Sequence, residues 1–168
     1  MFKKYFYFVA IPFLMVACQK KSVAPPAPAC PYSPVTAVAS SAEVANLKAF
    51  LDSSAITYTQ HPSGIFYKIL AQGAGDTANV CLAVLVKYKG QLTNGVGFDS
   101  SYVRSPNGAA FNLGGLILGW QVGIPLVQKG GSIMLYIPPS LGYGSNGAGP
   151  IPPNANLIFK IDLLDMRK

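Results

Sequence analysis

The chain has 168 residues, of which 51% are hydrophobic and 11% charged, and 13 Lys and Arg against six Asp and Glu give a formal net charge of +7 at pH 7. The cationic residues are scattered, and no stripe of interleaved basic and aromatic side chains is present. This distribution argues against nucleic-acid binding despite the positive net charge. About a hundred residues are enough for a single hydrophobic core, and neither a second domain nor an internal repeat is evident.

The N-terminus has the form of an export signal. Two lysines precede an apolar run from Tyr5 to Ala17, which Pro12 interrupts and Cys18 ends. This run is too short to span a bilayer comfortably, whereas its length and its basic start are typical of a signal peptide. We therefore expect residues 1–17 to be removed and the mature protein to be extracytoplasmic.

The end of this signal resembles the cleavage box of bacterial lipoproteins, in which the cysteine is acylated and becomes the new N-terminus. The segment reads Leu14-Met-Val-Ala-Cys18, with Met15 where that box usually has Leu. The alternative is an ordinary secretory signal followed by an incidental cysteine, but the small residue before Cys18 and the polar run after it favour acylation. We predict a lipid anchor at Cys18, in the outer membrane because Gln19 provides no clear retention signal.

Residues 18–41 are rich in Pro, Ala, Ser and Val. Such a segment cannot bury an apolar face and tends toward extended, semi-rigid conformations. It is predicted to be a disordered tether between the anchor and the domain.

Two further cysteines could be either joined in a disulfide or unpaired. Cys30 lies in the tether and Cys81 starts an apolar run. In an oxidising compartment they could form a disulfide that adds about 2–4 kcal/mol by restricting the unfolded chain. Otherwise Cys81 is a buried thiol and Cys30 is free, because sequence spacing does not show whether the two α-carbons come within about 7 Å.

A helix is predicted where the tether ends. Ser40 to Glu43 has the form of a capping box, and Val44, Leu47 and Leu51 recur at helical spacing after it. We expect a short amphipathic helix over residues 42–53, with residues 42–63 forming the helix and a linker into a domain of residues 64–168.

Within that domain, five segments rich in branched and aromatic residues are bounded by Gly, Pro or Asn and predict strands: 64–70, 80–91, 111–113, 132–137 and 157–164. Thr93-Asn-Gly95 predicts a turn. One short helix is expected over residues 119–126, kept short by Pro125. The predicted fold class is α+β, an antiparallel β-sheet wrapped around one short helix.

Five motifs in a fixed order carry a family resemblance: Val86-Lys-Tyr-Lys-Gly90, Gly97-Phe-Asp-Ser-Ser101, Leu116-Ile-Leu-Gly-Trp120, Leu141-Gly-Tyr-Gly144 and Ile151-Pro-Pro-Asn-Ala155. Together they resemble the FKBP family of peptidyl-prolyl cis/trans isomerases, from about Gly64 to Leu164. The resemblance implies an enzyme that rotates Xaa-Pro bonds in proline-containing polypeptides and assists the folding of exported proteins. No cofactor or metal is implied, and we expect a monomer.

The resemblance also implies an apolar pocket for the proline ring. Trp120 is its expected floor, and Tyr88, Phe98 and Phe159 are its expected walls. The alternative for all four is a place in the ordinary core, because strand periodicity and a lone Trp on a short helix predict burial by themselves.

Polar groups and the rim of this pocket are assigned by the same resemblance. The backbone amide of Ile117 and the hydroxyl of Tyr143 are expected to hold substrate carbonyls, and Asp99 to accept a hydrogen bond beside Tyr88. Asp99 could instead be a solvated turn residue bonded to its own backbone. Three residues are expected to bind substrate around the pocket: Arg104, Leu116 and Ile151.

A function of a different class remains as an alternative. A peptide-binding or assembly lipoprotein of the cell envelope could keep this fold without catalysis. It would show peptide binding at the same pocket and no acceleration of isomerisation.

Overall fold

The structure, a computed structural model, describes residues 29–167. The predicted signal peptide, Cys18 and the first part of the predicted tether lie outside the described residues. Among those that are described, residues 29–40 form no helix or strand. In this part of the chain no helix is long and apolar enough to cross a bilayer.

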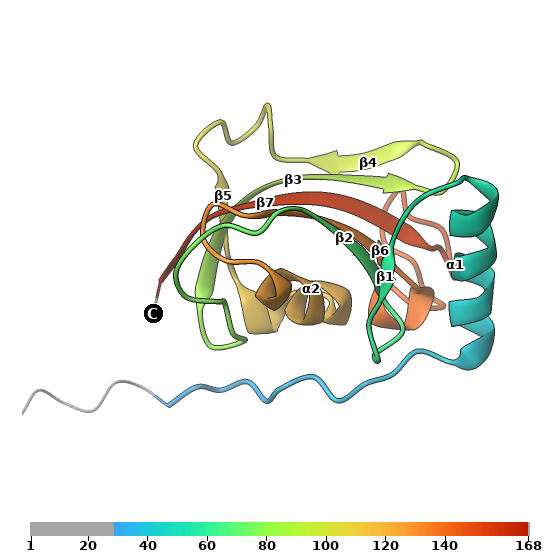
Figure 1. The fold of residues 1–168 in the computed structure, drawn as a ribbon, viewed down its shortest axis with the longest axis horizontal. Coiled ribbons are helices and arrows are strands. Elements are labelled where there is room, and N and C mark those ends of the chain that lie inside the picture. The colour runs from blue at the N-terminus through green and yellow to red at the C-terminus, as the bar shows by residue number, and fades with distance from the viewer. Residues whose placement is uncertain (1–28, 168) are drawn as a thin grey trace, which may run out of the picture.

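A single antiparallel sheet of seven strands dominates the fold (Figure 1). Its strands are β1 (Thr59–Gln60), β2 (Phe66–Ala71), β3 (Ala83–Leu92), β4 (Gly97–Ser100), β5 (Ala109–Asn112), β6 (Ser132–Ile137) and β7 (Leu157–Arg167). The order across the sheet is β1-β2-β6-β7-β3-β4, and β5 also pairs with β3. The long strand β3 therefore has two partners on one edge: its start pairs with β5 and its end with β4.

The sheet curves over the short helix α2 (Leu118–Gly123), as Figure 1 shows. Strand β3 buries alternate residues, Val84, Val86 and Tyr88, on the face toward α2, as the side-chain period of two in a strand requires. Pro125 cannot continue an α-helix, and the chain tightens after Gly123 into the 3-10 turn η2 (Ile124–Leu126). The main core fills the space between sheet and helix.

Helix α1 (Ser41–Ser53) lies beside the sheet and packs on a second, smaller core. Its N-terminus forms the predicted capping box, in which the Ser40 hydroxyl accepts from the Glu43 amide and the Glu43 carboxylate accepts from the Ser40 amide. Leu47 and Leu51 are fully buried against Phe66 and Ile158.

Residues 29–40 are attached to the domain at three places, one of them a hydrogen bond from the Ala39 amide to the Ser63 carbonyl at 2.9 Å. Cys30 forms a disulfide with Cys81, with the α-carbons 5.3 Å apart. The ring of Tyr32 lies on Gly114, so closely that a β-carbon there would be 2.6 Å from Cδ1 of the tyrosine. A side chain at position 114 would therefore displace Tyr32.

The α+β fold predicted from the sequence is confirmed, with differences in detail. Two strands were not predicted, β1 and β4, because one has two residues and the other is half Gly and Ser. The strand expected over residues 111–113 starts earlier, at Ala109, since it pairs with β3 from there. Leu113 instead begins the 3-10 turn η1 (Leu113–Gly115).

Candidate active site

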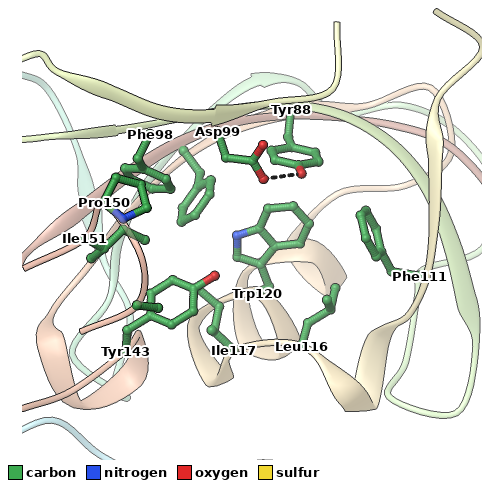
Figure 2. A pocket seen from close by; sticks show the side chains of 12 residues that line it. Tyr88, Phe98, Asp99, Phe111, Leu116, Ile117, Trp120, Tyr143, Pro150 and Ile151 are labelled. Carbon is green, nitrogen blue, oxygen red and sulfur yellow. Dashed lines mark hydrogen bonds between the residues drawn. The ribbon is translucent and has the colours of Figure 1, made fainter. Parts of the chain in front are cut away.

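A cavity of about 330 Å³ opens between the sheet, α2 and the segment that connects β6 to β7. It is lined by Tyr88, Phe98, Asp99, Phe111, Leu116, Ile117, Trp120, Tyr143, Ala148, Pro150, Ile151 and Phe159. Figure 2 draws all of these side chains and labels most of them. The lining is mainly apolar, with a small number of polar groups, as is usual for a site that binds a small organic group.

Trp120 forms the floor, and its position follows from the turn before it. Ile117 has extended backbone, with ψ of 147°, and its carbonyl accepts from the Trp120 amide to start α2. This first turn directs the indole toward the sheet, where 4% of the residue is exposed. Its Nε1 has no hydrogen-bond partner among residues 29–167, so the floor is an apolar surface with one unused donor.

Three aromatic rings meet this floor at steep angles. The centroids of Tyr88 and Phe159 lie 5.2 Å from that of Trp120, at interplanar angles of 78° and 88°, and that of Phe111 lies 6.3 Å away at 88°. Phe98 in turn packs edge-to-face on Phe159 at 5.4 Å. Edge-to-face pairs are favourable and hold their rings in fixed orientations, which makes a rigid pocket wall.

Asp99 has three hydrogen-bond partners at the edge of the cavity, and one of them is the Ser100 backbone amide, which donates to Asp99 Oδ1 at 2.8 Å. The Tyr88 hydroxyl donates to Asp99 Oδ2 at 2.5 Å (Figure 2), and Arg104 forms an ion pair with Oδ1 of the same carboxylate. Burial first, and then the neighbouring Asp99, raise the pKa of Tyr88 to about 12. The phenol is therefore neutral at physiological pH and keeps donating to the carboxylate.

Arg104 lies beside Asp99, as the resemblance implies. It is not part of the cavity lining, because its guanidinium is held on the outer side by the Asp99 carboxylate and the Ser100 carbonyl. The same guanidinium also donates to the Tyr88 hydroxyl at 3.5 Å, so Arg104 is placed to orient both Asp99 and Tyr88.

Besides Trp120 Nε1, two hydrogen-bond donors of cavity-lining residues have no acceptor among residues 29–167. The Ile117 amide precedes α2 and donates to no acceptor among residues 29–167. Within the same range the Tyr143 hydroxyl has no hydrogen bond, and Figure 2 shows it turned toward the Trp120 side of the cavity. Burial and the Asp99 charge raise the pKa of Tyr143, so this hydroxyl also stays protonated.

The other predicted pocket residues, Leu116, Ile117 and Ile151, also lie on the cavity wall. The sequence patterns did not single out Phe111 and Pro150, which line it too. Phe111 stands in a segment that predicts only a strand, and its facing α2 follows from the pairing of β5 with β3. Pro150 lies beside Ile151, in a run of prolines that predicts only a loop.

Comparison with known proteins agrees with this fold and site. Residues 75–164 match the family described as FKBP-type peptidyl-prolyl cis-trans isomerase. A probable FKBP-type isomerase of Haemophilus influenzae is 49% identical over 105 residues, which are 62% of this chain and 43% of that protein. FkpA of Escherichia coli K12 is 42% identical over 105 residues, 62% of this chain and 38% of FkpA.

Solved structures give the same result. The crystal structure of Escherichia coli FkpA superposes with a TM-score of 0.68 at 37% identity, covering 75% of this chain and 60% of that one. That of AtFKBP13 superposes with a TM-score of 0.61 at 34% identity, covering 66% of this chain and 99% of that one. The chain belongs to the FKBP-type peptidyl-prolyl cis-trans isomerase family, and it spans less than half the length of the first two curated relatives.

Proposed function

We propose that this protein is a peptidyl-prolyl cis/trans isomerase that acts on proline-containing polypeptides exported from the cytoplasm. The observation that carries the proposal is the aromatic cavity with two unused donors, the Ile117 amide and the Tyr143 hydroxyl, at its wall. Membership of the isomerase family supports the same activity. No observation favours the non-catalytic alternative.

The chemistry needs only binding. Rotation about an Xaa-Pro bond faces a barrier of about 18–20 kcal/mol and takes roughly tens to hundreds of seconds without a catalyst. No covalent bond is broken, so no nucleophile, metal or cofactor has to take part. An enzyme accelerates this rotation when it binds the twisted imide more tightly than either planar isomer.

The cavity residues suit that twisted state. A twisted imide has lost resonance, so its carbonyl carries less charge and is less costly to transfer from water to an apolar surface. Trp120 and the rings around it provide such a surface for the pyrrolidine ring. The Ile117 amide and the Tyr143 hydroxyl would hold carbonyls on either side of the imide, and fixed donors of this kind need no reorganisation during the rotation.

Refolding of a protein whose slow phase is limited by one Xaa-Pro bond tests this proposal. A catalytic amount of the wild-type protein is expected to accelerate the slow phase, and Trp120→Ala to lose most of the effect. A slow phase that keeps its spontaneous rate, with peptide binding retained, would replace the proposal by the non-catalytic alternative.

We propose that the protein acts outside the cytoplasm, attached to the cell envelope through acylated Cys18, in the outer membrane. The motif Leu14-Met-Val-Ala-Cys18 supports the anchor, and the bond between Cys30 and Cys81 supports an oxidising compartment. Mass spectrometry of the mature protein should show acyl chains on Cys18, and Cys18→Ala should yield an unlipidated, soluble form. An unmodified wild-type Cys18 would contradict the anchor.

We propose further that the protein works as a monomer and does not bind nucleic acid. The scattered cations support the second statement. Sedimentation of the chain without its signal peptide, alone and with a duplex DNA, would test both.

A further inference from the structure

Helix α1 precedes the residues that match the family, 75–164, yet it contacts the connection that carries part of the active site. This connection, residues 138–156, joins β6 to β7 and contains four cavity residues, Tyr143, Ala148, Pro150 and Ile151. In Figure 1 the connection reaches the side of α1 from the ends of β6 and β7.

Both ends of the connection are bonded to α1. At its start, the Ser140 amide donates to Glu43 Oε1 at 3.1 Å and the Ser140 hydroxyl to Glu43 Oε2 at 2.7 Å. At its end, the side-chain Nδ2 of Asn156 donates to Asn46 Oδ1 at 2.9 Å. Glu43 and Asn46 are three residues apart and therefore share one face of the helix.

The helix itself is a firm support for these two side chains. Leu47 and Leu51 are fully buried in the smaller core, and the capping box fixes the first turn, where Glu43 lies. Burial tends to raise the pKa of Glu43, but the hydrogen bonds from Ser140 and Ser40 outweigh it and leave the pKa below the ordinary value. The carboxylate is thus charged at neutral pH, and charge-assisted bonds are stronger than neutral ones.

Backbone hydrogen bonds within the connection hold Tyr143 close to Ser140, the residue that is bonded to Glu43. The Gly144 amide donates to the Pro139 carbonyl at 2.9 Å, and the Asn154 amide to the Gly144 carbonyl at 2.9 Å. Tyr143 therefore lies in a short loop that the bond between Pro139 and Gly144 closes, and Gly144 is bonded in turn to Asn154 in the second half of the connection. A shift at Ser140 would move the Tyr143 hydroxyl.

We infer that α1 is a working part of the active site: Glu43 and Asn46 clamp the two ends of the 138–156 connection and so position Tyr143. Glu43 acts through Ser140 and is a positioning residue, since it does not touch the cavity. The inference rests on the proposed isomerase function, in which Tyr143 holds a substrate carbonyl.

A matched pair of variants separates this role from ordinary helix capping. Ser140→Ala and Ser40→Ala each remove one hydroxyl from the same carboxylate, the first on the side of the connection and the second on the side of the helix. We expect Ser140→Ala to lower kcat and kcat/KM together by about threefold to tenfold, with KM unchanged, as for the loss of one hydrogen bond that positions a catalytic group. Ser40→Ala should lower the unfolding midpoint and leave kcat/KM within about twofold of wild type.

Releasing both ends should have a larger effect. Glu43→Ala/Asn46→Ala removes the acceptors of all three bonds, including the one from the Ser140 backbone amide that Ser140→Ala keeps, and is expected to lose more activity than Ser140→Ala alone. Glu43→Gln, which keeps an acceptor for the Ser140 amide, should retain more activity than Glu43→Ala.

Fluorine NMR gives a readout that does not depend on catalysis. With 3-fluorotyrosine at every tyrosine of the chain without its signal peptide, the Tyr143 signal is the one that Tyr143→Phe removes. It is expected to shift or broaden in Ser140→Ala and to stay in place in Ser40→Ala.

The outcomes are distinct for the two hypotheses. Wild-type kcat/KM and an unmoved Tyr143 signal in both Ser140→Ala and the double variant would overturn the clamp. If the wild type itself shows no isomerase activity, the proposed function fails, and the Tyr143 signal alone then decides whether α1 positions this residue.

Discussion

Gly90 provides a direct test of whether the aromatic wall determines activity. It lies in β3 beneath two rings of the cavity, where a β-carbon would be 2.6 Å from Phe98 Cζ and 2.7 Å from Phe159 Cε1. Carbon atoms in favourable contact are about 3.5–4.0 Å apart. In Gly90→Ala each ring must therefore retreat by about 1 Å, away from the strand and into the cavity.

The size of the effect follows from this displacement. Inserting a methyl group into a packed site costs about 1–3 kcal/mol of folding free energy, so the variant should still fold with a lower unfolding midpoint. A misplacement of about 1 Å in a catalytic site can cost about a hundredfold in rate. We expect kcat/KM to fall by about tenfold to a hundredfold, mostly through weaker binding of the twisted imide.

Gly97→Ala is the matched control. Gly97 lies in the neighbouring strand β4, and a β-carbon there would meet only the Gly90 carbonyl, at 3.9 Å. Urea unfolding and a peptide isomerisation assay would be run on both variants. Activity in Gly90→Ala equal to that of Gly97→Ala, at a clearly lower stability, would refute the role given to the Phe98 and Phe159 walls.

Other predictions concern single groups of the site and the attachment of residues 29–40. Tyr143→Phe should fold normally and lose about tenfold in kcat/KM, as expected when one neutral donor is removed; full activity would remove the hydroxyl from the mechanism. Cys30→Ser should lower the free energy of unfolding by about 2–4 kcal/mol, because the bond to Cys81 closes a long loop in the unfolded chain; equal unfolding curves with and without reductant would contradict this. Tyr88 has a folded-state pKa raised from 10.0 to about 12, so its stabilising effect is complete below pH 10 and lost as the pH rises to about 12. The fall in unfolding midpoint over that interval should be smaller in Tyr88→Phe than in wild type, and identical profiles would show that its ionisation is not linked to folding.

Local patterns in the sequence were sufficient for the elements with strong signals. Ser40 and Glu43 predicted the start of α1, and the branched residues of Ser132–Ile137 predicted β6 with the observed bounds. Strand β4 carries no such signal, because Gly97 and two polar residues give it no hydrophobic alternation. It is a strand through its pairing with β3 at Lys89–Gln91, which is a property of the folded chain.

The residues of the site divide in the same way, into those that local motifs predict and those that depend on pairing in the folded chain. Trp120 and Tyr143 were recognised from motifs, whereas Phe111 enters the cavity only because β5 pairs with the start of β3. The pairing of Cys30 with Cys81 stayed open because 51 residues of chain separate them, and such a spacing sets no distance. The contacts of Glu43 with Ser140 could not be predicted either, since they join residues 97 positions apart.

Exchange NMR on a short peptide with one Xaa-Pro bond tests the central claim most directly. With catalytic amounts of the wild-type protein, cross peaks between the cis and trans resonances should grow far faster than in the free peptide, and Trp120→Ala should return them close to the spontaneous rate. Exchange in the presence of the wild-type protein that equals the spontaneous rate, for peptides with several residues before proline, would contradict the account.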